Sequence, residues 1–224
     1  VFQNIVLGSD LFFRTYGQPA DFEAESALLT HDRPLLAPST RDRLLARVAA
    51  DDWGAAIFTA RPSLPPADLP EEQPDALSFP PDADLAAELL GLAGRLPLIG
   101  LGRLEWAARH RGRAVADYTK PSPVQALAAI GAAASGGALH ESGELAGPLA
   151  ALAGRPLRVV VFEDTQGGVQ AVRSAVECLG RSGLDVACEA VGIASEPDKR
   201  AALSAVADRV VEDVNRALEP YLAG

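Results

Sequence analysis

The sequence predicts an α/β fold in which helices cover both faces of a parallel β-sheet. Short apolar runs alternate with amphipathic helical patterns along most of the chain, and strands that alternate with helices in this way form parallel sheets. The last third shows the alternation most clearly. There the apolar run in PLRVVVFED precedes a helical pattern in GGVQAVRSAVECLGRSG and a second apolar run in DVACEAVGIA. Hydrophobic residues make up 48% of the 224 residues, which is enough for a full core.

Residues 1–32 are expected to form a small helical unit ahead of the core. Apolar residues of the first segment recur at helical spacing that is interrupted at Gly17 and Pro19, which predicts two short helices. Residues 33–224 are expected to form the α/β core. Its first helix is predicted to be capped by Ser39 or Thr40 and to end near Gly54.

Within this core, strands are expected in AAIFTA, RLPLIGL, AVADYT, PLRVVVFED, DVACEAVGIA and DRVVEDV. Helices are expected in DADLAAELLGLAG, RLEWAARHRG, SPVQALAAIGAAA, GGVQAVRSAVECLGRSG, PDKRAALSAVA and NRALEPYLAG. Two insertions are read as loops. The insertion at 61–81 holds seven prolines, and the insertion at 134–148 is rich in glycine.

The charge balance argues against some partners. The chain carries 30 acidic and 20 basic residues, a formal charge of −10, which disfavours nucleic acid and an anionic membrane surface. The sequence has no run of about 18 apolar residues that would span a membrane, and it shows no secretory signal pattern. A cytoplasmic location is therefore expected. Cys178 and Cys188 are read as reduced core thiols, and no oligomeric state is specified.

Polar side chains follow the apolar runs at the points where strands should end. Thr59, Lys120, Glu163 and Asp164 all stand at or just past such an end, which is where open parallel sheets bind ligands. Adjacent carboxylates repel each other and resist burial. A divalent cation is the expected compensation for Glu163 and Asp164, and Mg²⁺ prefers carboxylate and water ligands.

Three stretches resemble motifs of the haloacid dehalogenase-like (HAD) hydrolases. VFEDTQGGVQAV is similar to the fourth motif of the family, DYTKPSPVQAL to the third and AAIFTARPS to the second, and they occur in the family's order. The resemblance covers roughly residues 33–220. It implies a Rossmann-like three-layer core with a small, partial helical cap at the N-terminus.

The resemblance also implies roles for individual residues. Thr59 would donate a hydrogen bond to phosphoryl oxygens, Lys120 would neutralise the phosphate, and Asp164 would hold Mg²⁺ with Glu163 as a direct or indirect ligand. Arg61 either reaches the substrate phosphate or lies on the surface. The implied activity is Mg²⁺-dependent hydrolysis of a small phosphorylated metabolite, a phosphate monoester.

The nucleophile of the family's first motif, Asp-x-Asp after an apolar strand, is not found. The nearest approach is NIVLGSDLFF, with Gly8 in the nucleophile position and Asp10 in the acid/base position. Either the first strand is missing from this chain and residues 1–32 are part of a helical cap, or the strand is present in NIVLGS and has lost its nucleophile. Asp82-x-Asp84 follows prolines and is read as a pair of helix-cap residues.

Other functions and simpler readings of the same residues stay open. A non-catalytic HAD-like protein that binds a ligand or a partner is the alternative function, and an unrelated doubly wound binding domain is a third. In a simpler reading that is separate from these functions, Glu163 and Asp164 cap the following helix in solvent. In the same reading Thr59 would be an ordinary strand-end residue, and Lys120 an ordinary surface lysine.

Overall fold

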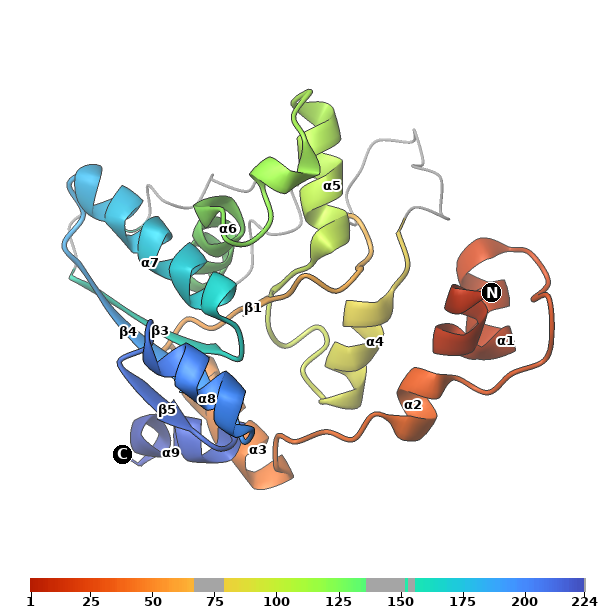
Figure 1. The fold of residues 1–224 in the computed structure, drawn as a ribbon, viewed down its shortest axis with the longest axis horizontal. Coiled ribbons are helices and arrows are strands. Elements are labelled where there is room, and N and C mark those ends of the chain that lie inside the picture. Colours follow the sequence, from red (N-terminus) through yellow and green to blue (C-terminus); the bar gives the residue numbers. More distant parts are fainter. Residues whose placement is uncertain (67–78, 136–151, 153–155, 224) are drawn as a thin grey trace.

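The computed structural model describes residues 1–66, 79–135, 152 and 156–223 (Figure 1). The α-helices are α1 (Phe2–Tyr16), α2 (Ala27–His31), α3 (Pro38–Ala49), α4 (Asp82–Leu89), α5 (Leu101–His110), α6 (Pro123–Ala134), α7 (Gln166–Arg181), α8 (Pro197–Ser204) and α9 (Val214–Leu222). The strands are β1 (Ile57–Phe58), β2 (Leu98–Ile99), β3 (Leu157–Glu163), β4 (Val186–Ile193) and β5 (Arg209–Val211), and η2 (Val115–Asp117) is a 3₁₀ helix. This is the mixed α/β architecture that the sequence predicts. Most of both predicted insertions lies outside the described residues.

The parallel strands form two separate sheets. One sheet has the order β3-β4-β5, and the other pairs β1 with β2. The second sheet is short, since only Ile57 pairs with Leu98 and Phe58 with Ile99. The single sheet that the sequence predicts is therefore in two parts, because no described strand pairs with both β1 and β3.

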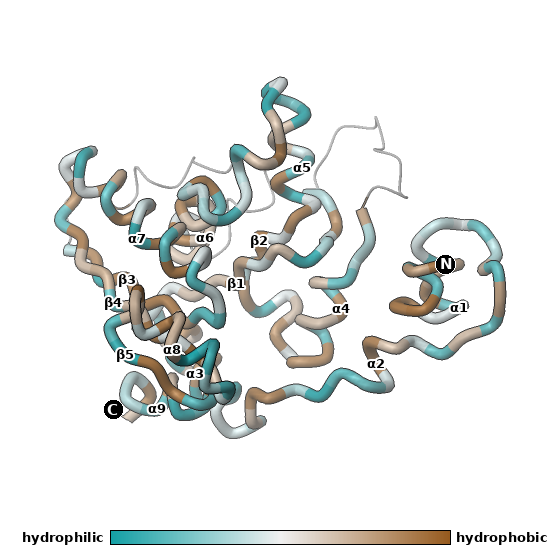
Figure 2. The backbone as a smooth tube through the Cα atoms, viewed as in Figure 1, coloured by the Kyte–Doolittle hydropathy of each residue, from teal (hydrophilic) through white to brown (hydrophobic). Residues whose placement is uncertain are grey.

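The three-stranded sheet is covered by helices on both faces (Figure 1). On one face, Val161 of β3 packs in a buried cluster with Val172 of α7 and Leu203 of α8. On the other face, the ring of Phe162 meets the ring of Tyr221 of α9 at a centroid distance of 5.5 Å. Consecutive strand residues point to opposite faces, so an apolar run is what a strand between two helical layers requires. Hydrophobic stretches accordingly run through the strands (Figure 2).

Helix α6 connects the two sheets. Its residue Gln125 is fully buried, and its Nε2 donates to the carbonyl oxygens of Thr59 at 2.8 Å and of Ile99 at 2.9 Å. The same helix contributes Ala126 to the core of the three-stranded sheet and Ala128 to the cluster that includes Ile99. One helix thus supplies both the packing and the polar contacts that hold the short sheet in place.

The N-terminal residues are helical, as predicted. NIVLGS lies inside α1, where Gly8 makes a kink with φ 74° and ψ 165°, so the alternative in which it forms the first strand is wrong. Asn4 Nδ2 and Ser9 Oγ each donate to the carbonyl oxygen of Phe22 at 3.0 Å, which holds the connection to α2 against α1. None of the helices in the described parts of the chain has the length and apolar character needed to cross a bilayer.

Two local predictions were wrong. The segment AVADYT forms η2 instead of a strand, and its residue Tyr118 is buried in the cluster with Ile99 and Leu104. Helix α3 begins after Ala37 with Pro38 in its first turn and has no side-chain cap, because the fixed φ of proline and its missing N–H suit that position. Ser39 therefore lies inside the helix.

The hydrogen bonds of Asp208 predict that the stability of the protein depends on pH. Its Oδ2 accepts the N–H of the buried Ala190 at 2.7 Å, and Arg173 donates to its Oδ1 at 3.0 Å. The Ala190 N–H, helped by Arg173, lowers the pKa of the Asp208 carboxyl below its ordinary value. A depressed folded-state pKa gives stability that is present above the unfolded-state pKa and is lost as pH falls through the folded-state pKa.

We therefore expect the free energy of unfolding to fall as pH is lowered from about 7 to about 3, and to fall less steeply in Asp208→Asn. Asparagine keeps an acceptor for Ala190 but does not titrate. Urea unfolding at several pH values measures both slopes. Asp198→Asn is the control, because Asp198 is an exposed acid in the first turn of α8. Equal slopes for Asp208→Asn and the wild type would contradict the prediction.

Candidate functional site

The centre of the candidate site is an ion pair between Lys120 and Glu163. Lys120 lies in the connection before α6, and its Nζ donates to Oε1 of Glu163 at the end of β3. The same Nζ lies 4.1 Å from the ring centroid of Phe58 at the end of β1. The two side chains are 16% and 5% exposed. Lys120 therefore marks the point where the carboxyl ends of β1 and β3 come together.

Glu163 is held from its other oxygen by the start of α7. Its Oε2 accepts from the N–H of Thr165 at 3.2 Å and from the Thr165 hydroxyl at 2.9 Å. Thr165 also caps α7, because its Oγ1 accepts the N–H of Gly168 at 3.1 Å. A Cβ at Gly168 would collide with the Glu163 carboxyl group. Because Gly168 has no Cβ, the buried carboxylate of Glu163 can lie against the first turn of α7.

Asp164 is placed differently from its neighbour. It is exposed just past the end of β3. Glu163 is 5% exposed and both of its oxygens accept hydrogen bonds, so Asp164 is the more accessible carboxylate of the predicted pair. No cluster of three or more potential ligand side chains occurs in the part of the chain that the structure describes. Asp164 fits Mg²⁺ chemistry as a single carboxylate, and the described residues do not complete a ligand set around it.

Thr59 stands one residue after Phe58 and is partly exposed. Its N–H donates to the carbonyl of Ile99 at 3.1 Å, and its Oγ1 accepts the N–H of Arg61 at 3.2 Å. Because the hydroxyl acts as an acceptor there, its hydrogen remains able to donate to an anion. Arg61 lies 3.5 Å from Asp32, and both side chains are about half exposed, 53% and 50%. An exposed ion pair of this kind contributes little to the stability of the fold.

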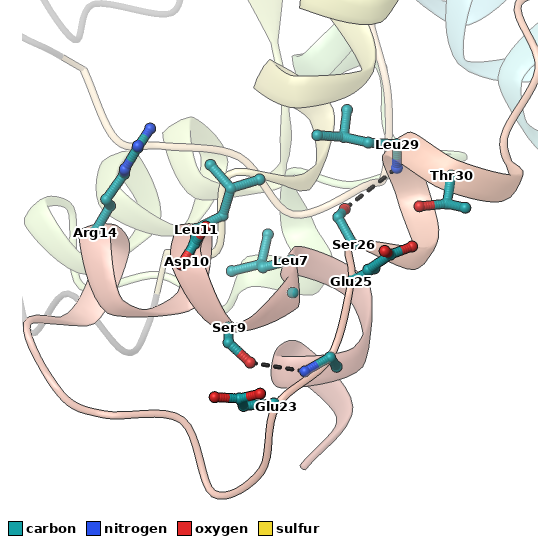
Figure 3. A pocket seen from close by; sticks show the side chains of 12 residues that line it. Leu7, Ser9, Asp10, Leu11, Arg14, Glu23, Glu25, Ser26, Leu29 and Thr30 are labelled. Atoms are coloured by element: carbon teal, nitrogen blue, oxygen red, sulfur yellow. Dashed lines mark hydrogen bonds between the residues drawn. The ribbon is translucent and has the colours of Figure 1, made fainter.

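Asp10 is in a different part of the fold. It lies in α1 and lines an open hollow of ≈ 830 Å³ between α1 and the segment leading to α2 (Figure 3). Glu23 and Glu25 line the same hollow, with Arg14 as its basic residue. Lys120 comes from the connection before α6, away from this unit (Figure 1). The structure therefore does not group Asp10 with the residues at the strand ends.

Asp82 is a buried acid whose environment the sequence did not reveal. It is 7% exposed, and its Oδ1 has no hydrogen-bond partner among the described residues. Burial raises the pKa of the Asp82 carboxyl, with Arg61 opposing this shift and Asp84 adding to it. Burial and the nearby Asp82 raise the pKa of Tyr16 at the end of α1. The predicted cap role missed this burial, because it depends on how α1 packs against α4.

The site thus combines a positive charge, a hydroxyl donor and an exposed carboxylate at the ends of two strands. Lys120 and Glu163 are in direct contact, while Thr59 and Asp164 each follow a residue that belongs to this contact. The signal that would have separated Glu163 from Asp164 is the alternation along β3, which puts Glu163 on the same face as the buried Val161. No family model, no curated protein and no solved structure matches this chain.

Proposed function

We propose that the chain binds the phosphate group of a small phosphorylated metabolite at the carboxyl ends of β1 and β3, which lie close together. The observation that carries the proposal is the contact of Lys120 with both Phe58 and Glu163, which brings a positive charge to these strand ends. In this proposal the Thr59 hydroxyl donates to a phosphate oxygen. Asp164 contributes a ligand to a Mg²⁺ ion that neutralises part of the phosphate charge.

The motif order Thr59, Lys120, Glu163-Asp164 supports descent from a Mg²⁺-dependent phosphohydrolase of the HAD type with a Rossmann-like core. We propose that this chain keeps the binding part of that function and not the turnover. The nucleophile position of the nearest motif is Gly8, which lies inside helix α1. Glycine has no side chain that attacks phosphorus, and a positive charge with a hydroxyl donor stabilises an anion without a nucleophile.

Glu163 limits the affinity of the proposed site. An incoming phosphate has to share Lys120 with a carboxylate that is 5% exposed and bound by Thr165. Like charges at close range disfavour each other, so phosphate alone should bind weakly. A divalent cation at Asp164 would reduce this repulsion, which predicts that Mg²⁺ and phosphate bind more tightly together than separately.

Calorimetric titration tests this proposal with Mg²⁺ alone, with inorganic phosphate alone and with each in the presence of the other. We expect dissociation constants of about 1 mM for the separate ions. Each ion should bind a few-fold more tightly when the other is present. Asp164→Asn should weaken Mg²⁺ binding about tenfold, or ~1.4 kcal/mol, because a neutral amide replaces a charged oxygen ligand.

The control is Asp185→Asn, which removes one charge from an exposed residue just before β4, at the opposite end of the sheet. It should leave Mg²⁺ binding unchanged. Equal losses in the two variants would show that Mg²⁺ binds diffusely to the acidic surface, and the proposed site would be wrong. Hydrolysis of an aryl phosphate that disappears in Asp164→Asn would overturn the part of the proposal that denies turnover.

A further inference from the structure

Residues 1–31, which we call the N-terminal unit, are held together by contacts of their own. Besides the bonds to the carbonyl of Phe22 described above, Ser26 Oγ donates to the carbonyl of Val6 at 2.8 Å. In Figure 1 the unit lies at one end of the molecule, next to α4. Residues 32–37, which lead from α2 to α3, form neither helix nor strand. The position of the unit therefore depends on how it packs against α4.

The apolar contact between the unit and α4 is small. Leu7 of α1 and Leu28 of α2 form a buried cluster with Leu85 of α4, and Tyr16 packs against this cluster. Among the described residues of the cluster, only Leu85 comes from outside the unit. A contact of this size gives a docking energy that the charge of one covered group can change substantially.

Asp82 lies on the part of α4 that the unit covers. It stands three residues before Leu85, so the two side chains are neighbours on the helix surface. Asp82 is 7% exposed, and its Oδ1 has no hydrogen-bond partner among the described residues. The Tyr16 hydroxyl is also buried and has no partner in that part of the chain. The docked unit thus covers a carboxyl group that is poorly compensated.

The charges that act on Asp82 come from three segments. Burial has the largest effect on the pKa of Asp82 and raises it, Arg61 after β1 lowers it, and Asp84 in the same helix raises it. Arg61 also lies 3.5 Å from Asp32 in the connection to α3, so its charge is shared between two acids. The pKa of Tyr16 is raised above its ordinary value of 10.0, so this phenol stays neutral in acid and at neutral pH.

We propose that protonation of Asp82 controls how tightly the N-terminal unit docks on α4. A neutral carboxyl group is covered at low cost, whereas an ionised one loses its hydration when the unit covers it. Docking should be tightest below the ordinary carboxyl pKa of about 4. It should weaken as pH rises through the raised pKa of the docked state and stay constant above that pKa. The unit is thus an element that closes on α4 in acid.

This pH dependence is opposite in sign to that expected from Asp208. The hydrogen bonds of Asp208 stabilise the whole fold as pH rises, while the docking of the N-terminal unit weakens over the same range. Measurements of global unfolding add the two effects together. The test therefore has to follow the contact between the unit and α4 directly.

Nuclear magnetic resonance of the isotopically labelled chain follows this contact. The nuclear Overhauser effect between the methyl groups of Leu85 and those of Leu7 and Leu28 measures docking, and the chemical shift of the Asp82 carboxyl carbon measures its titration. From about pH 4.5 to about pH 7.5, we expect the Overhauser effect to fall about twofold or more. Its midpoint should equal that of the Asp82 titration. A constant effect, or a different midpoint, would overturn the proposal.

Asp82→Asn tests the charge directly. Asparagine keeps the shape of the side chain and does not titrate, so the Overhauser effect should stay at its acid level at every pH. Asp84→Asn is the matched control in the same helical turn, where Asp84 Oδ2 accepts the N–H of Leu64 at 2.8 Å. Its contact should still depend on pH. Loss of the dependence in Asp84→Asn, or its persistence in Asp82→Asn, would contradict the assignment to Asp82.

Two variants should move the midpoint in opposite directions. Asp84→Asn removes a charge that raises the pKa of Asp82, so the midpoint should shift to lower pH. Arg61→Gln removes the charge that lowers this pKa, so the midpoint should shift to higher pH. If Asp82→Asn does not fold, these shifts decide the question. Shifts in the same direction, or no shift in either variant, would refute the control of docking by Asp82.

Discussion

Replacing Gly168 by alanine is expected to lower the free energy of unfolding by about 3 kcal/mol, at the upper end of what overpacking costs. The added Cβ would collide with the carboxyl group of Glu163. That carboxyl group cannot move away easily, because it is bound by Lys120 on one oxygen and by Thr165 on the other. Either the ion pair or the first turn of α7 has to shift. Urea unfolding of the variant and the wild type measures the difference.

Gly167 provides a matched control in the same helical turn. A Cβ at this position would meet nothing within 4 Å. Gly167→Ala should therefore be neutral or should stabilise the protein by about 0.5–1 kcal/mol, because alanine is the better helix former. If Gly168→Ala changed the free energy of unfolding no more than Gly167→Ala does, the Glu163 carboxyl group would not occupy the position described.

Glu163→Gln is expected to destabilise the protein by about 3 kcal/mol, which is the effect of leaving a partly buried charge without its partner. Lys120 is 16% exposed and lies over the ring of Phe58, so water reaches it poorly. Glutamine keeps the size of the side chain and an oxygen that accepts from Thr165. The variant thus tests the charge rather than the packing. Thermal and urea unfolding report the loss.

Asp164→Asn separates stability from ligand binding. Asp164 is exposed, and surface substitutions away from special contacts usually change stability by less than about 0.5 kcal/mol. The two neighbouring variants should therefore affect different properties. Glu163→Gln should lower the stability of the protein, and Asp164→Asn should lower its Mg²⁺ affinity. A stable Glu163→Gln protein would contradict the assignment of Glu163 as the residue that holds Lys120.

Sequence patterns predicted most helices and strands because their apolar spacing is long and regular. In α7, Val169, Val172 and Leu179 recur at helical spacing and are all buried. The structure of short segments was harder to predict. AVADYT begins with three apolar residues, but none of the strands that the structure describes pairs with it, and the buried Tyr118 holds it as a 3₁₀ turn.

The sequence indicated the residues of the candidate site but not the contacts between them. The sequence identified Lys120, Glu163 and Asp164, because each stands at or just past the end of an apolar run. The sequence could not show that Lys120 forms its ion pair with Glu163, because this pairing depends on which face of β3 meets α6. The division of the strands into two sheets was also hidden, because pairing between strands depends on residues far apart in the chain.

Because the amide of Gln125 bonds to both short strands from α6, we expect β1, β2 and α6 to open as one cooperative unit. A single buried side chain holds the carbonyl oxygens of Thr59 and Ile99, and a ladder of two residue pairs has little stability of its own. When α6 opens, both strand ends are released together, so amides in all three elements should exchange with a shared opening rate. Lys120 lies three residues before the first residue of this helix. We therefore expect the contact of Lys120 with Glu163 to be lost when this unit opens, so that the positive charge leaves the strand ends through a collective motion.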